Sequence, residues 1–241
     1  MRSGTILMAC CAAAFAAGCA DVKSSDVKTS GMSASMQVVA NGGTSATATA
    51  SVTVGTDYVE LSGGDALTAN TTTSPAPIAM SESKLLGIIS YAATLGDGAA
   101  EGNESRITYN RSGNTSAPNS TCTMPAPFNL TGPSAGATFS RSNQDIVVSW
   151  DASGKSSPMQ YQAKGDCIDT VQAGTIPADT GTVTIPKGSI HASTSGSNAS
   201  TSCAITVTVT RSSAGLLDPA FGGGGSISCM QQRSVQVQSA P

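Results

Sequence analysis

Hydrophobic and polar residues alternate along much of this chain, which is the pattern of β-strands that bury one face. The alternation starts at Met36 and Val38 and is clearest over residues 46–54, where apolar residues take every second position. The segment Asn41-Gly42-Gly43 separates these two runs. Glycine and asparagine tolerate the positive φ angles of a tight turn, so the two runs are predicted to form a hairpin.

Further short runs indicate that the strands continue as an antiparallel set. They cover residues 58–61, 66–69, 78–84, 87–95 and 104–111. Gly, Asn or Pro bounds most of them, and the runs are rich in Thr and β-branched residues, which disfavours helices. We therefore expect an N-terminal β domain over residues 34–124.

A second set of strands follows the proline-containing stretch around Pro118 and Pro125. Its strand-like runs cover residues 145–150, 159–163, 182–185, 203–211 and 226–238. These runs predict a C-terminal β-sandwich over residues 125–241. The expected fold class is all-β, with two antiparallel β-sandwich-like units.

The first 18 residues have the pattern of an export signal. Arg2 precedes the apolar run Ile6–Ala17, and the small residues Ala16-Ala17-Gly18 lead into Cys19. The apolar run is too short to span a bilayer as a stable helix, and small residues suit a signal peptidase. Residues 19–33 have little apolar content and no regular period, which predicts a flexible tether.

The segment Ala16-Ala17-Gly18-Cys19 resembles a bacterial lipobox, although Ala16 stands where leucine is usual. The resemblance implies that Cys19 becomes the acylated mature N-terminus, carrying chains such as palmitate. The implied location is the bacterial cell envelope, on the outer membrane because Ala20 rather than Asp follows the anchor. Cleavage by an ordinary signal peptidase after Gly18 is the alternative, and it would give a soluble secreted protein.

The stretch Asp145-Ile-Val-Val-Ser-Trp150, behind a Gly/Pro turn, resembles the tryptophan-bearing strand of immunoglobulin-like and fibronectin type III-like sandwiches. It departs from antibody domains because no cysteine lies on the preceding strand. The segment Val59–Asp65 (V-E-L-S-G-G-D) is similar to one found in uncharacterised bacterial lipoproteins. That resemblance implies an address and a fold, but no activity.

The segment Leu217–Gly222 (L-D-P-A-F-G) resembles a short repeat that occurs in many copies in propeller-like bacterial proteins. One copy cannot close a propeller, so we expect a structural role. Asp218-Pro219 is predicted to start a turn and Phe221 to enter the core.

Four cysteines, Cys122, Cys167, Cys203 and Cys229, remain beyond the signal and Cys19. An even number in an exported chain predicts two disulfides, and four cysteines allow three pairings. Because the first and last strands of a sandwich often lie side by side, we expect Cys122–Cys229, with Cys167–Cys203 nested inside. All four are expected to staple the C-terminal unit, so that reduction would leave residues 34–120 folded.

Composition excludes some partners. Charged residues make up 11% of the chain, aromatic residues 4%, and the formal net charge is −3. No basic patch is present to neutralise phosphates, so nucleic acid is not an expected partner. The expected partner is the membrane, through the lipid anchor, together with an unidentified protein or glycan of the envelope.

The sequence offers few candidates for chemistry, and no cofactor is expected. His191 is the only histidine, and no zinc-type ligand pair accompanies it. The weak metal candidate is calcium, because four oxygen-bearing residues share one glycine-rich loop: Asp97, Glu101, Asn103 and Glu104. Trp150 is expected in the core, whereas Tyr58 and Tyr109 are the aromatic residues that could face a sugar.

These observations predict a non-enzymatic, lipid-anchored envelope protein that acts as a binding or structural module. Two alternatives stay open. One is an envelope hydrolase that uses His191 with a nearby Ser and Asp, and the other is a glycan-binding module.

The anchor can be tested with the substitution Cys19→Ser. Because several acyl chains are needed for stable anchoring, the variant should move from the membrane to the soluble fraction. Fractionation of cells that express each form measures this. A Ser variant that still pellets with membranes would show that the lipobox interpretation is wrong.

Overall fold

The computed structural model describes residues 22–154, 158–169, 172–193 and 202–241, so the predicted signal segment and Cys19 lie outside the described residues. The described chain consists of strands and two short 3-10 helices, which confirms the predicted all-β class. In chain order the elements are β1 (Val22–Lys23), η1 (Ser24–Asp26), η2 (Thr29–Gly31), β2 (Ser33–Ala40), β3 (Ala46–Val54), β4 (Asp57–Glu60), β5 (Ala66–Thr71), β6 (Ile78–Ala79), β7 (Ser81–Leu85), β8 (Ile88–Leu95), β9 (Glu104–Asn110), β10 (Ala117–Thr123), β11 (Leu130–Gly132), β12 (Thr138–Ser140), β13 (Ile146–Trp150), β14 (Met159–Gly165), β15 (Gln172–Ile176), β16 (Thr182–Ile185), β17 (Cys203–Ala214) and β18 (Gly225–Ala240).

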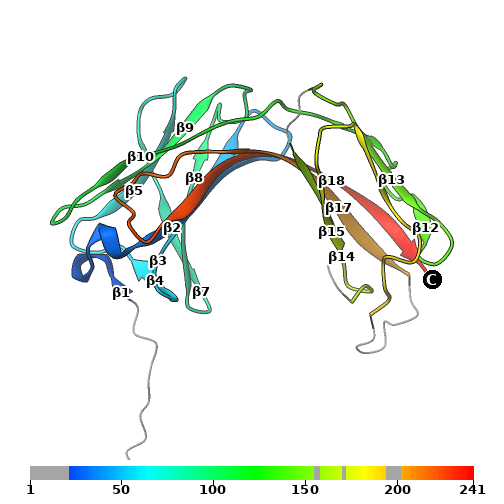
Figure 1. Cartoon of the computed structure of the whole chain (residues 1–241), viewed down its shortest axis with the longest axis horizontal. Coiled ribbons are helices and arrows are strands. Elements are labelled where there is room, and N and C mark those ends of the chain that lie inside the picture. The colour runs from blue at the N-terminus through cyan, green and yellow to red at the C-terminus, as the bar shows by residue number, and fades with distance from the viewer. Residues whose placement is uncertain (1–21, 155–157, 170–171, 194–201) are drawn as a thin grey trace, which may run out of the picture.

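One long sheet runs through the whole molecule and bends into an arch (Figure 1). Its strand order is β1-β4-β3-β2-β18-β17-β14-β15, with β7, β8 and β12 attached beside it. The sheet β10-β9-β5-β6 covers one arm, and the sheet β11-β13-β16 covers the other. Each arm is thus a two-layer sandwich. We call the arm covered by β10-β9-β5-β6 the first unit and the arm covered by β11-β13-β16 the second unit.

Two separate cores lie between these layers. The first contains the inward residues of the predicted alternation, such as Met36, Val38 and Ala48. The second is built around Trp150, as expected for its strand. Strand β18 serves both cores, because Ile227 and Cys229 belong to the first and Val237 to the second.

The predicted C-terminal domain of residues 125–241 does not form one unit, because part of it returns to the first unit. The first half of β18, Gly225–Gln231, pairs in parallel with Ala34–Ala40 of β2. The turn at Asp218 also belongs to the first unit, where the Phe221 ring stacks on Tyr109 with 5.9 Å between ring centroids. The sequence does not indicate that β18 passes from the first unit to the second, because its strand-like alternation continues without an internal Gly or Pro.

The predicted tether of residues 19–33 is wrong from Val22 onward. Strand β1 pairs in parallel with β4, and the side chains of the two 3-10 helices include Ser24 and Thr29, both 0% exposed. The Arg111 guanidinium donates to the carbonyl oxygens of Ser24 and Val27 at 2.6 and 3.0 Å. These polar residues are ordered by hydrogen-bond partners rather than by apolar burial, and a composition argument cannot detect such partners.

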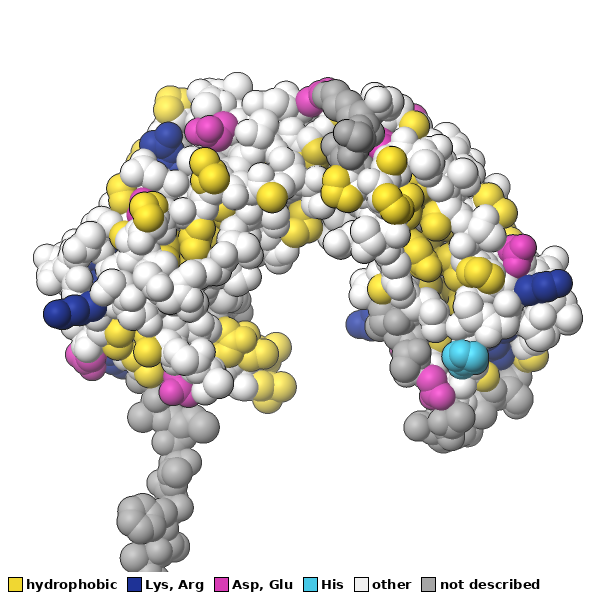
Figure 2. Space-filling view, in the orientation of Figure 1, with side chains coloured by type: hydrophobic (Ala, Val, Ile, Leu, Met, Phe, Trp, Pro, Cys, Tyr) yellow, Lys and Arg dark blue, Asp and Glu magenta, His cyan; other side chains and the backbone are white. Residues whose placement is uncertain are grey.

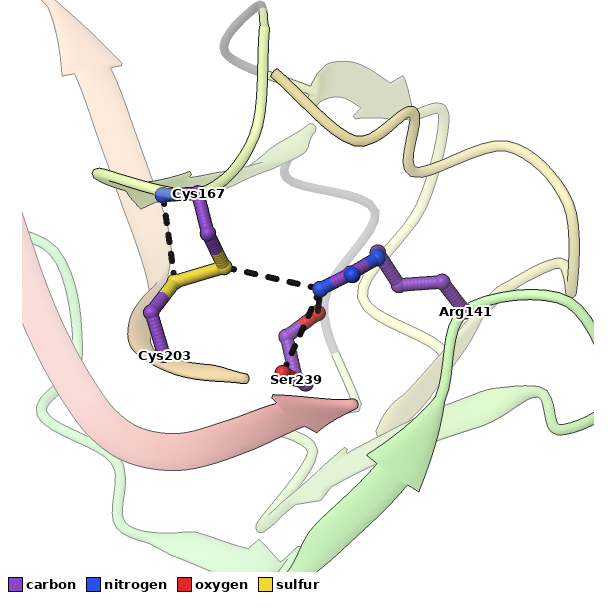
Figure 3. Close-up of a disulfide and its surroundings, with 4 residues drawn as sticks. All are labelled: Arg141, Cys167, Cys203 and Ser239. Carbon is purple, nitrogen blue, oxygen red and sulfur yellow. Dashed lines mark hydrogen bonds between the residues drawn. A yellow bond between two sulfur atoms is a disulfide. The ribbon is translucent and has the colours of Figure 1, made fainter. Parts of the chain in front are cut away.

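Both disulfides are present and join the pairs expected from the sequence. Cys122 is bonded to Cys229, with a sequence separation of 107, and Cys167 to Cys203, with a separation of 36. Beside the second bridge, Arg141 Nη1 lies 3.5 Å from Cys167 Sγ and 3.1 Å from Ser239 Oγ (Figure 3). The first bridge, however, belongs to the core of the first unit, so the expectation that both would staple the C-terminal unit is wrong.

Where the two units meet, polar side chains of the long strands β17 and β18 form hydrogen bonds with neighbouring segments of the chain. Arg211 of β17 donates to the carbonyl oxygen of Ala126 at 2.7 Å and to Asp179 Oδ2 at 2.6 Å. Gln231 of β18 is 0% exposed and donates to the carbonyl oxygen of Ala99 at 2.7 Å. A buried group without its partner carries its full desolvation cost, so these bonds fix the geometry of the junction.

Separate removal of the two disulfides should affect different units. In the chain-entropy estimate, the 107-residue loop of Cys122–Cys229 contributes ~5 kcal/mol and the 36-residue loop of Cys167–Cys203 contributes ~4 kcal/mol. The paired substitution Cys122→Ser with Cys229→Ser should therefore lower hydrogen-exchange protection in β2, β9 and β10. The matched control, Cys167→Ser with Cys203→Ser, should lower protection around β14 and β17. Loss confined to the second unit in both variants would contradict this assignment.

Acid should destabilise the second unit through Asp179. Burial acts to raise the pKa of this carboxyl, but hydrogen bonds from Ser153 and Trp150 and the charge of Arg211 outweigh it and hold the pKa below its usual value. A depressed folded-state pKa contributes stability above the unfolded pKa, about 3.9, and that stability is lost as pH falls through the folded pKa. Thermal unfolding measured from pH 6 to pH 2 should show this loss.

The variant Asp179→Asn should remove this part of the pH dependence. It should also lower stability at neutral pH by ~3–5 kcal/mol, because the Arg211 charge would lose its buried partner. Asp57→Asn, at an exposed strand end, is the control and should change neither quantity. If Asp179→Asn loses stability in acid as the wild type does, Asp179 is not the group that causes this loss.

Candidate functional site

The inner face of the arch is the surface that the covering sheets leave open. Figure 1 shows the sheets β10-β9-β5-β6 and β11-β13-β16 on the outside of the two arms and the long sheet on the inside. Because side chains alternate along a strand, the residues between the core positions of β14, β17 and β18 point to this inner face.

Cross-strand pairing lines up neutral polar side chains on this face. Gln162 of β14 lies opposite Thr208 of β17, and Thr208 lies opposite Ser234 of β18. The hydroxyl oxygens of Thr208 and Ser234 are 2.8 Å apart and share a hydrogen bond. A second row joins Gln160 to Thr210, and Thr210 to Gln232. The two rows present amides and hydroxyls, which both donate and accept hydrogen bonds.

An open cavity of about 420 Å³ lies over these rows. This volume falls within the range of small-molecule sites in proteins, roughly 300–1,000 Å³. The described residues of its lining are Gln160, Tyr161, Gln162, Ala173, Gly174, Thr175, Thr208, Thr210, Met230 and Gln232, and among these only Tyr161 is ionisable. The cavity can therefore offer neutral hydrogen bonds, but no strong charge, to a ligand.

Tyr161 contributes to the edge of this cavity while packing against the second core. It lies opposite Gly174 of β15, and a side chain at position 174 would collide with the tyrosine ring. Glycine is required here so that the ring can cross the neighbouring strand.

The predicted calcium residues do not form a metal site. Asp97 accepts hydrogen bonds from Thr71 at 3.0 Å and from Ser74 at 3.1 Å, and its backbone carbonyl accepts from Asn103 at 3.0 Å. Glu104 pairs with Arg106 instead, and Glu101 lines a different cavity beside Arg211. In the described part of the chain, no group of three or more His, Cys, Asp or Glu side chains is placed to hold a metal. The structure thus separates Glu101 and Glu104 from Asp97, whose carboxylate accepts hydrogen bonds from threonine and serine hydroxyls.

His191 is exposed, and the structure does not assemble a triad around it. Its carbonyl oxygen accepts a hydrogen bond from the Asp169 backbone at 3.2 Å. Across residues 158–169, 172–193 and the other described ranges, no hydrogen bond joins its imidazole to a hydroxyl or carboxylate. The arrangement that a serine hydrolase needs is therefore not found in the described residues.

The aromatic residues considered for sugar binding serve the cores. Trp150 is buried and donates its indole N–H to Asp179 at 2.7 Å. Tyr109 is 0% exposed, and burial raises its pKa to about 12. Tyr58 is partly buried and packs against the first core. The polar cavity was not predicted, although the Thr-x-Thr-x-Thr pattern of residues 206–210 indicates a row of hydroxyls on one face of a strand.

No protein-family model matches the chain, and no curated protein sequence matches it significantly. Solved structures give distant likenesses. The chicken CNTN1 FN1–FN3 domains are 14% identical with a TM-score of 0.24, covering 86% of this chain and 65% of that one. A titin fragment is 11% identical with a TM-score of 0.26, covering 86% of this chain and 96% of that one.

A third likeness is the complex of Dpr11 IG1 with DIP-gamma IG+IG2, at 9% identity and a TM-score of 0.25, covering 86% of this chain and 95% of the matched one. This chain spans about 65% of the CNTN1 chain. Likenesses at these TM-scores carry no argument about function. The assignment to a two-unit β-sandwich fold rests on the strand registers of the chain itself.

The described residues contain no helix that is long and apolar enough to cross a membrane.

Proposed function

We propose that this chain is an exported, lipid-anchored protein of the bacterial cell envelope that acts as a non-enzymatic binding module. The polar cavity on the inner face of the arch is its binding surface. The observation that carries the proposal is the pair of cross-strand rows, Gln162–Thr208–Ser234 and Gln160–Thr210–Gln232, beneath a cavity of about 420 Å³.

The chemistry of the lining favours an uncharged, hydroxyl-rich ligand such as a glycan. Glutamine amides and threonine hydroxyls match sugar hydroxyls, which also donate and accept hydrogen bonds. An anionic ligand would meet no cationic side chain among the described lining residues. The rigid junction through Arg211 and Gln231 supports the same role, since a preorganised surface loses less freedom on binding.

The envelope location rests on the first 19 residues. The apolar run and the Ala16-Ala17-Gly18-Cys19 segment support export and acylation of Cys19. Val22 enters β1 at the edge of the long sheet, so at most a few residues separate the proposed anchor from the folded body. The arch would therefore stand close to the membrane rather than at the end of a long tether.

A glycan array followed by calorimetric titration of the hits tests the binding proposal. Removal of one hydrogen-bonding group, by Thr208→Val or Gln160→Ala, should weaken binding about three- to tenfold, because a net hydrogen bond is worth roughly 0.5–1.5 kcal/mol. The control is Thr49→Val, a threonine on β3 of the same sheet but outside the cavity. It should bind as the wild type does.

Two results would contradict the proposal. One is the absence of any envelope glycan that binds at millimolar concentration. The other is binding that Thr208→Val and Gln160→Ala leave unchanged. Turnover of a bound glycan, detected by mass spectrometry of the recovered ligand, would show that the module is an enzyme.

A further inference from the structure

The hairpin of β7 and β8 ends in an exposed apolar tip, formed by Leu85, Leu86, Gly87 and Ile88. Leu86 is 95% exposed, Leu85 is 70% exposed and Ile88 is 51% exposed. All five residues of β7 are exposed, whereas Ile89, the second residue of β8, is buried. The tip therefore projects from the first unit and contributes nothing to either core.

The turn at the tip is built from a residue that the fold does not favour. Leu85 pairs with Ile88, so Leu86 and Gly87 form a two-residue loop, with φ angles of 50° and 81°. Two positive φ angles mark a turn in which Asn-Gly is the preferred sequence. A leucine in this conformation is strained, and its side chain has no contact in the core to compensate. The stability of the fold therefore does not explain why leucine occupies this position.

The tip lies on the same side of the molecule as Val22, where the described chain begins. Glu60 of β4 pairs with Lys23 of β1 at 2.5 Å and with Lys84 of β7 at 3.5 Å, which links the start of the described chain to the base of the tip. In Figure 1 the β7–β8 hairpin and the entry into β1 point to the same side. Figure 2 shows apolar side chains gathered at the protruding end of this arm.

The chain length sets how far the anchor can be from this place. Three residue steps separate Cys19 from Val22, a reach of at most about 11 Å. A lipid-bearing Cys19 would hold this side of the first unit against a bilayer, within reach of side chains that extend from the hairpin.

The charges around the tip do not oppose contact with lipid. Lys84 and Lys23 pair with Glu60, and Glu82 of β7 accepts a hydrogen bond from the Tyr91 hydroxyl at 3.1 Å. The balance of two lysines and two glutamates indicates contact through apolar burial rather than through attraction to anionic headgroups.

We propose that the apolar tip inserts into the bilayer that carries the lipid anchor and provides a second attachment point. The inference rests on the proposed lipid anchoring for its geometry. Two attachment points on one arm define an orientation, which a single flexible anchor cannot do. The tip thus contacts the acyl region of a membrane. Contact with a protein partner or with a second copy of this chain is the alternative that the experiments below test.

A fluorescent reporter at the tip tests the insertion directly. The full chain carrying Leu86→Cys, labelled with an environment-sensitive nitrobenzoxadiazole dye, is reconstituted in vesicles of phosphatidylethanolamine and phosphatidylglycerol. The emission should shift to shorter wavelength, and lipids with a quencher on the acyl chain should quench it. Val147→Cys, an exposed apolar site on β13 of the other unit, is the matched control and should show neither change.

An unshifted emission from Leu86→Cys in vesicles would overturn the insertion. A shift that appears without vesicles and grows with protein concentration would assign the tip to self-association and would overturn it as well. The mass of the N-terminal peptide reports the acylation of Cys19 independently. A chain that lacks acylation at Cys19 can therefore be distinguished from a chain whose tip does not insert.

The substitution Leu86→Asn separates lipid binding from folding. It creates the preferred Asn-Gly turn, so the thermal midpoint should stay the same or rise, while the apolar side chain is lost. In the Cys19→Ser background, where the tip alone contacts lipid, vesicle partitioning should fall about tenfold. Val147→Asn in the same background should leave partitioning unchanged. Equal partitioning of Leu86→Asn and its parent would refute the proposal.

Discussion

The pairing of β17 with β18 is the interaction on which the rest of the structure depends. The two strands stay in register from Cys203 opposite Ser239 to Ala214 opposite Ser228, and this ladder crosses from one sandwich to the other. On one side β18 adds β2 of the first unit, and on the other β17 adds β14 of the second. The two units therefore share a continuous sheet rather than a flexible linker, and their relative orientation follows from backbone hydrogen bonds.

The cores themselves are modest, and buried polar groups supplement them. Small residues such as Ala48 and Ala50 fill much of the first core, and the chain has few aromatic residues. Each unit contains one ion pair whose side chains are nearly fully buried, Arg111 with Asp65 and Arg211 with Asp179. Burying a charge is costly unless it is paired, so such pairs penalise misplaced packing more than they add stability. Each unit also has one disulfide, which restricts its unfolded chain.

The sequence predicted what depends on local pattern. Alternation of apolar residues identified most of the strands, the Trp150 strand was placed in a core, and Phe221 was correctly expected to fill a gap. The predictions that failed depend on contacts between distant residues. The order of residues 22–33 comes from Arg111, more than 75 positions away, and the hydroxyls that occupy Asp97 come from a different strand and loop. The polar cavity appears only when four strands, β14, β15, β17 and β18, are placed in register, which the sequence of one strand cannot reveal.

The sharing of β18 also bears on the order in which the protein can assemble. The β2 strand of the first unit has β3 on one side and β18 on the other. Cys122 of that unit can form its disulfide only after Cys229 has been synthesised. A chain that emerges from its N-terminus has all of β1 to β10 available long before their central neighbour exists. Neither the sheet nor the disulfide of the first unit can be completed until residues 225–231 arrive. Contacts of such long sequence separation form slowly. The first unit can therefore be completed only after nearly the whole chain is available, which disfavours the folding of one unit before the other is made.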